Sequence, residues 1–120
     1  MTVAIGKNLK SRQTEGAVVG DVVLQGQGAV KVMHSGTHLQ LVELRLKKGF
    51  YHPLHNHPAN ESIGYVISGQ LEMKIGDETY LLGPGDAWHH GIGVHHYTKA
   101  LEDTYAIESH SPLRDEYTSA

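Results

Sequence analysis

The chain has 120 residues, of which 39% are hydrophobic and 19% charged, and its 10 basic and 13 acidic side chains give a formal net charge of −3 at pH 7. This length suits one domain with its own core, and the composition is too apolar for a disordered chain and too charged for a membrane-embedded one. The mild acidity without a Lys- or Arg-rich run argues against nucleic acid and membrane partners, and the absence of cysteine excludes disulfides, thiolate ligands and a cysteine nucleophile.

The first predicted unit is a polar N-terminal arm, residues 1–16, followed by one β domain over residues 17–120. The start of the chain lacks the apolar run of a signal peptide, so the expected location is the cytoplasm. In the domain, short β-favouring runs alternate with glycine-containing breaks, and no window has a sustained helical period. The runs are VVLQG (22–26), AVKVM (29–33), HLQLVELRL (38–46), SIGYVISG (62–69), LEMKIG (71–76), TYLLGPG (79–85) and TYAIESH (104–110). This pattern predicts an all-β sandwich or barrel with few or no helices.

The runs around Ser68-Gly69 predict a β-hairpin with a two-residue turn. Such a turn pairs Val66 with Leu71 and Gly64 with Met73, and the apolar members of the second run are expected to face the core. The register therefore turns one set of side chains inward, namely Ser62, Gly64, Val66, Leu71, Met73 and Ile75.

Histidine is concentrated in two segments, 52–57 and 89–96. His55 and His57 are two residues apart, so on an extended chain they project to the same side and can chelate one ion. Neutral imidazole suits zinc, copper, iron and nickel, and Glu61 supplies a nearby carboxylate. This spacing predicts a metal site.

Two motifs surround these histidines. The first runs from Gly49 through FYHPL, His55-Asn56-His57 and PAN to Glu61 and Gly69, and the second from Gly85 through DAWHH, Gly91, Ile92 and Gly93 to His96. With them the chain resembles the cupin family over about residues 41–117, since the family patterns are G(X)5HXH(X)3,4E(X)6G and G(X)5PXG(X)2H(X)3N. The chain has Gly91 where the second pattern has proline and Ala100 where it has asparagine.

The resemblance implies a single-domain, cupin-type double-stranded β-helix, or jelly-roll barrel, that is frequently a homodimer. It also implies one divalent transition metal ion, either Zn, Fe, Mn, Ni or Cu, held by His55, His57, His96 and Glu61 at one end of the interior. The fourth ligand stays open at this point: Glu61 lies one residue too far from Gly69, and the hairpin register turns Ser62 inward instead.

The remaining histidines have simpler interpretations. We expect His34, His38 and His52 to be solvated or turn residues, and His95 to be structural or exposed. His90 shares a strand face with Trp88, and this face either touches a ligand or belongs to the core.

The C-terminal segment ALEDTYAIESHSPLRDEY is similar to the tail of small cupins that open the ring of 4,5-unsaturated uronates in pectin and alginate degradation. The resemblance implies Glu108, His110 and Arg114 as catalytic residues facing the metal, with histidine in place of the aromatic residue of these cupins. An arginine fork suits a carboxylate, and an acid or histidine can move a proton.

Three functions follow as alternatives. The first is a metal-dependent, non-redox isomerase or lyase that acts on a small anionic sugar acid or carboxylate held by the metal and Arg114. The second is a metal-dependent dioxygenase. The third is a non-catalytic ligand-binding or sensor domain with a closed, structural metal.

Overall fold

The structure is a computed structural model that describes residues 12–13, 18–19, 22–23 and 27–112. Its regular elements in these residues are all strands. No helix in this part of the chain is long and apolar enough to cross a membrane. The strands are β1 (Arg12–Gln13), β2 (Val18–Val19), β3 (Val22–Val23), β4 (Gly28–Ser35), β5 (Gln40–Leu46), β6 (Tyr51–His55), β7 (Glu61–Ser68), β8 (Leu71–Ile75), β9 (Glu78–Leu82), β10 (Ala87–His90), β11 (His96–Ala100) and β12 (Thr104–Ser111).

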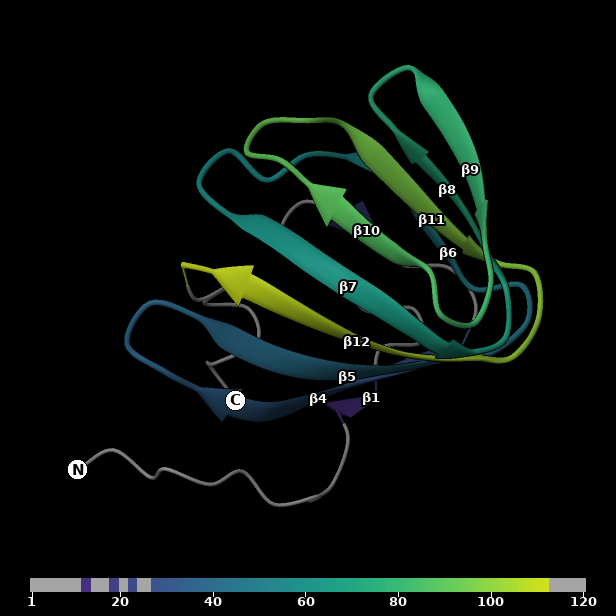
Figure 1. Cartoon of the computed structure of the whole chain (residues 1–120), viewed down its shortest axis with the longest axis horizontal. Helices are drawn as coiled ribbons and strands as arrows, with labels where there is room; N and C mark the ends of the chain where they lie inside the picture. The colour runs from purple at the N-terminus through teal and green to yellow at the C-terminus, as the bar shows by residue number, and fades with distance from the viewer. Residues whose placement is uncertain (1–11, 14–17, 20–21, 24–26, 113–120) are drawn as a thin grey trace.

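The strands form two main antiparallel sheets, so the predicted all-β jelly roll is confirmed (Figure 1). The six-stranded sheet has the order β1-β4-β5-β12-β7-β10 and the four-stranded sheet the order β6-β11-β8-β9, while β2 and β3 pair with each other. Strand β12 lies between β5 and β7, pairing His110 with both Gln40 and Ser62. The last described strand therefore completes the sheet that earlier strands begin.

The core lies between the two sheets. Strands β7 and β12 alternate buried and less buried residues along their length, which is the pattern of a sheet with one face covered. Both sheets contribute to the cluster of buried hydrophobic residues: Val30, Val42, Leu46, Phe50, Val66, Leu71, Met73, Leu82, Trp88, Ala100 and Ala106.

The prediction that β7 and β8 pair with each other as a hairpin is wrong. The turn at Ser68-Gly69 carries the chain from one sheet to the other, so β7 pairs with β10 and β12 whereas β8 pairs with β9 and β11. Gly69 has a φ of 94°, and a Cβ at this residue would collide with the backbone of Asp103. The turn is thus packed against the β11–β12 connection, where Thr104 Oγ1 accepts a hydrogen bond from the Gln70 backbone N–H at 3.1 Å.

The inward faces expected from that hairpin are nevertheless correct. Ser62, Gly64 and Val66 are buried on β7, as are Leu71 and Met73 on β8. Alternation within a strand does not depend on which strand it pairs with, so the same side chains face inward in either arrangement. The apolar faces of β7 and β8 meet in the core whether the strands are neighbours in one sheet or lie in opposite sheets.

Candidate metal centre

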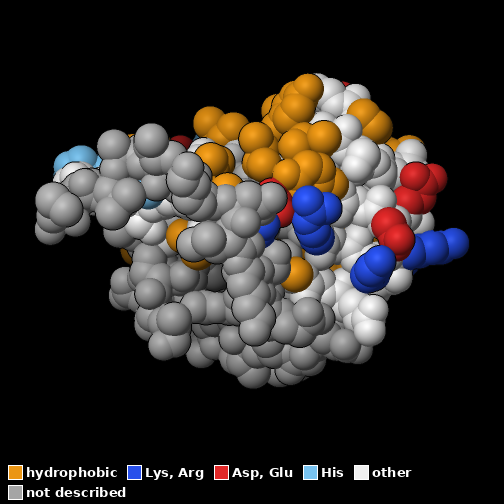
Figure 2. All heavy atoms as spheres, turned by 90° about the horizontal axis from the view of Figure 1, so that it is seen from below, with side chains coloured by type: hydrophobic (Ala, Val, Ile, Leu, Met, Phe, Trp, Pro, Cys, Tyr) orange, Lys and Arg blue, Asp and Glu red, His pale blue; other side chains and the backbone are white. Residues whose placement is uncertain are grey.

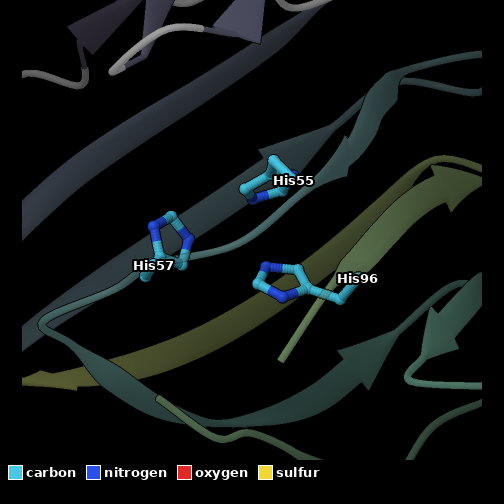
Figure 3. A group of neighbouring side chains, drawn as sticks. All are labelled: His55, His57 and His96. Atoms are coloured by element: carbon cyan, nitrogen blue, oxygen red, sulfur yellow. The ribbon is translucent and has the colours of Figure 1, made fainter. Parts of the chain in front are cut away.

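Three histidines, two from neighbouring strands and one from the loop after β6, converge at one end of the four-stranded sheet (Figure 3). His55 ends β6, His57 follows it by two residues, and His96 begins β11 directly opposite His55 in the strand register. Each ring offers one nitrogen, and these three nitrogens all lie within 4.8 Å of one another. His55 and His96 are buried, and His57 is half-buried.

Hydrogen bonds orient two of the three rings. Nδ1 of His55 lies 2.6 Å from the carbonyl oxygen of Pro53, and Nδ1 of His96 lies 3.1 Å from that of Val94. A ring nitrogen that faces a carbonyl carries the proton, so each ring presents the lone pair of its Nε2. This is the form in which histidine binds metals, and a carbonyl is a common partner for the other nitrogen.

The donor set therefore fits a divalent transition metal ion. Three neutral imidazoles suit zinc, iron, nickel and copper, and three protein ligands leave further coordination positions for water or substrate. His55, His57 and His96, the three histidines that the two motifs imply, would hold the ion.

A β-bulge in β6 brings His52 to the same side as His55. His52 pairs with Thr98, and His55 pairs with His96. Between these two pairs, β6 therefore contains one residue more than β11. The extra residue re-aims the side chain that follows it. His52 stacks on His55 with ring centroids 3.7 Å apart and planes 13° apart. It lines the cavity described below, and its interpretation as a solvated or turn residue is wrong.

Glu61 lies apart from the three rings. It begins β7 with its side chain on the outer face, half-exposed, where its carboxylate oxygen lies 3.0 Å from Nε2 of His89. The strand alternates regularly here, so the inward position belongs to Ser62, which is 3% exposed. The structure thus gives the place facing the interior to Ser62, as the register indicates, and does not bring Glu61 into the group.

Glu108 and His110 face the interior from β12, in the opposite sheet. The Glu108 carboxylate is held at both oxygens: Oε2 accepts hydrogen bonds from Trp88 Nε1 at 3.0 Å and from Ser62 Oγ at 3.2 Å, while Oε1 lies 3.1 Å from His110 Nε2. Both residues are buried. A carboxylate fixed in this way can accept a proton and then exchange it with the neighbouring imidazole without moving.

His90 joins the two groups. Its ring stacks on His96 with centroids 3.6 Å apart, and its Nδ1 lies 3.9 Å from Glu108 Oε2. Burial lowers the pKa of His90 to about 3, although the negative charge of Glu108 opposes this shift. The ring is therefore neutral near pH 7, and it lines the cavity against His96, whereas Trp88 on the same strand face belongs to the hydrophobic core.

The three convergent histidines and the Glu108–His110 pair share one cavity. It has a volume of about 50 Å³, and its walls include the rings of His55, His57 and His96 together with Glu108 and His110. A water molecule needs roughly 10–15 Å³ on this measure, so there is room for a few waters or one small group beside a metal ion. The structure thus places a candidate metal site and a candidate proton-transfer pair on facing walls.

Sequence reasoning missed the roles of His52, Trp88 and Ser62. Pro53 within the strand was the available signal for His52, since proline in a strand often marks a bulge or an edge. Trp88 and Ser62 hold Glu108 from other strands, and no local pattern shows that these residues meet. Arg114 lies outside the described residues, and its place facing the metal stays a prediction.

Residues 42–108 match the model of the Cupin domain family. Over 55 residues the chain is 38% identical to "Dimethylsulfoniopropionate lyase DddQ" of Ruegeria pomeroyi. The match covers 45% of this chain and 27% of that lyase, so the chain spans only a part of its length.

Solved structures with similar folds cover nearly the whole chain. KdgF from Halomonas sp. superposes with a TM-score of 0.80 at 26% identity, covering 94% of this chain and 98% of that one. An RmlC-like cupin from Shewanella frigidimarina superposes with a TM-score of 0.73 at 20% identity, covering 88% and 98% of the two chains. The second likeness concerns the fold alone.

Proposed function

The chain belongs to the cupin family, and from this premise we propose that it is a metal-dependent, non-redox enzyme, an isomerase or lyase, acting on a small anionic sugar acid or related carboxylate. One observation carries the proposal: a buried carboxylate and imidazole face three convergent histidines across one cavity. A purely structural metal needs no such pair, because its positions are closed by protein ligands.

The position of each residue indicates its role in the proposed reaction. His55, His57 and His96 would hold the ion, which supplies polarisation of a substrate oxygen when it is bound. Glu108 takes a proton from the substrate and returns it elsewhere in an isomerisation, or keeps it while a leaving group departs with its electron pair in an elimination. His110, 3.1 Å away, shares that proton, and the whole change needs no oxidant or reductant.

The immobilised carboxylate supports this role. Trp88 and Ser62 both donate to Oε2 of Glu108, so the other oxygen is left to His110 and the cavity. In the proposed complex, Arg114 holds the substrate carboxylate by a two-pronged hydrogen bond.

Two comparisons support the substrate class. The similarity to KdgF spans nearly the whole chain, and the tail with Glu108 and His110 resembles cupins that open unsaturated uronates. The name of DddQ indicates a lyase whose substrate is also a small carboxylate. An anionic carboxylate is common to both.

A dioxygenase is the second candidate. The observation that favours it is the donor set itself, three imidazoles within 4.8 Å, which also suits iron, copper or nickel with open positions for oxygen. Oxygen uptake separates the two candidates, because the isomerase or lyase consumes none.

The test begins with the metal content of the purified protein and of His55→Ala and His96→Ala. We expect bound metal in the wild type and its loss in both variants. The loaded wild type is then assayed with 4,5-unsaturated uronates and with dimethylsulfoniopropionate, while dissolved oxygen is recorded.

Glu108→Gln is the decisive variant for the chemistry. It should keep the metal and lose about 10²–10⁴-fold in turnover, because it can no longer accept a proton. Glu78→Gln, an exposed change on β9, is the matched control and should behave as wild type. Metal retained by both histidine variants, full activity in Glu108→Gln, or substrate-dependent oxygen uptake would each overturn the proposal.

A further inference from the structure

Two histidines outside the candidate ligand group, His52 and His90, stack face to face on two rings that belong to it. His52 stacks on His55 with centroids 3.7 Å apart, and His90 stacks on His96 with centroids 3.6 Å apart; the interplanar angle is 13° in both pairs. We propose that His52 and His90 are positioning residues that clamp these two ligand rings in their metal-binding orientation. The inference rests on the metal site of the proposed function.

The two stacking rings arrive from different directions. His52 reaches His55 along the same strand, because the bulge in β6 turns both side chains inward. His90 comes from β10 in the six-stranded sheet and crosses the core to His96 in the four-stranded sheet. The clamp on His96 therefore depends on the packing of the two sheets.

His90 is itself held in place. Its Nδ1 lies 3.4 Å from Ser62 Oγ and its Nε2 lies 3.2 Å from Met73 Sδ, with all three residues almost completely buried. A ring that is buried and in contact at both edges presents a fixed face to its neighbour. His96 is thus oriented by a carbonyl at its edge and by an imidazole on its face.

The two contacts limit different movements of each ligand ring. The carbonyl at Nδ1 sets the direction of the ring within its plane, and the stacked neighbour limits rotation of that plane. Together they keep the Nε2 of His55 and His96 aimed at the shared space, so less side-chain freedom is lost when the metal binds. Outer residues that orient metal ligands typically change affinity by about 10–100-fold.

His52 and His90 are not additional ligands in this arrangement. Among the described residues, the group whose ligand atoms lie within 4.8 Å of one another contains His55, His57 and His96. The lone pairs of an imidazole lie in the ring plane, so two nearly parallel stacked rings do not direct them to one point between them.

The test uses two substitutions at each position. His52→Phe and His90→Phe keep a flat ring and remove both nitrogens, whereas His52→Asn and His90→Asn keep a polar group and remove the ring. The dissociation constant for Zn²⁺ is measured by competition with a chelator of known affinity, and the visible spectrum of the Co²⁺-loaded protein reports the geometry of the site.

We expect the asparagine variants to bind Zn²⁺ about 10–100-fold more weakly, with a changed Co²⁺ spectrum. The phenylalanine variants should stay within about threefold of wild type. His89→Asn is the control, because His89 neighbours His90 on the same strand but is exposed on the outer face.

Two results would overturn the clamp. Wild-type affinity in both asparagine variants would show that the stacks have no effect, and equal weakening by phenylalanine and asparagine would assign the effect to the ring nitrogens. His52 is half-buried, so the pair of variants at this position decides the matter even if changes at His90 prevent folding.

The outcome is separable from the proposed function. If His55→Ala and His96→Ala lose the metal but the asparagine variants do not, the clamp fails and the metal site stands. If the asparagine variants weaken Zn²⁺ binding while no substrate is turned over, the clamp stands and the enzyme proposal fails.

Discussion

At the scale of single residues, the site depends on one indole ring and the space made for it. Trp88 pairs with Gly64 across β10 and β7, and its Nε1 donates to Glu108 at 3.0 Å. A Cβ on Gly64 would overlap the six-membered ring of the indole. Glycine is therefore required at position 64, because the indole ring of Trp88 lies against its Cα. Since Trp88 holds Glu108, the position of Glu108 depends indirectly on Gly64.

The first prediction concerns Gly64→Ala. We expect Trp88 to be displaced and the free energy of unfolding to fall by about 1–3 kcal/mol, the usual cost of overpacking a core. Trp88 is the single tryptophan of the chain, so its fluorescence reports the displacement directly. Gly83→Ala is the control, because a Cβ there meets no atom within 4 Å. An unchanged unfolding curve and emission maximum in Gly64→Ala would contradict the close packing.

Residue-level patterns predicted part of this arrangement. The alternation in β7 correctly placed Ser62 inward and Glu61 outward, because the direction of a side chain in a strand is a local property. Alternation alone does not place His52, because the bulge in β6 shifts the register by one residue and turns His52 to the same side as His55.

At the scale of elements, three neighbouring strands are tied together by Glu43 of β5. One carboxylate oxygen accepts from the Tyr105 hydroxyl of β12 at 2.7 Å, and the other lies 3.4 Å from Lys31 Nζ of β4 and 3.1 Å from Arg45 Nε. Burial raises the pKa of Glu43, but the hydrogen bonds from Tyr105 and Lys31 and the two positive charges outweigh it, so the pKa lies below its usual value.

The second prediction is a pH-dependent effect of Glu43→Gln. A carboxyl group whose pKa is lower in the folded state stabilises the fold above its unfolded pKa, and this contribution disappears as the pH falls through the folded value. We expect Glu43→Gln to lose about 1.5–3 kcal/mol near neutral pH, as for hydrogen bonds to charged groups. The difference from wild type should shrink as the pH falls below 4.5, the ordinary value.

Urea unfolding of both proteins near pH 7 and near pH 3 measures this difference. Glu78→Gln on the exposed strand β9 should have little effect at either pH. A destabilisation by Glu43→Gln that is equal at both pH values would show that the charge of Glu43 does not contribute.

At the scale of the whole molecule, the outer face of the six-stranded sheet carries an apolar patch. Ile63, Tyr65 and Ile67 alternate along β7 and are 57%, 46% and 41% exposed, and Leu41 lies in the same row as Ile63, across Ser109. Figure 2 shows hydrophobic side chains gathered on one side of the molecule, next to Lys, Arg, Asp and Glu side chains. Contiguous apolar surface of this kind often marks an interaction site.

The third prediction is that the chain forms a homodimer, as its resemblance to small cupins implies, and that this face contributes to the interface. In a two-fold symmetric dimer the same patch serves both subunits. Ile63→Lys should then shift the solution mass from dimer to monomer, measured by light scattering after size exclusion. Leu81→Lys, on β9 of the other sheet, should leave the mass unchanged. A monomeric wild type, or a dimeric Ile63→Lys, would rule out this interface.

The sequence by itself determined the β architecture and the inward faces of β7 and β8, which follow from local features: glycine-punctuated runs and a two-residue side-chain period. That His96 meets His55 and His57 was an expectation from the resemblance of two motifs to the cupin family, and the structure brings the three rings together. Only the tertiary structure decided which strands pair, that β7 and β8 lie in different sheets, and that Ser62 and Trp88 hold Glu108 opposite the three rings. The physical reason is that strand pairing depends on contacts between segments far apart in the chain, whereas alternation is set by the backbone of each strand alone.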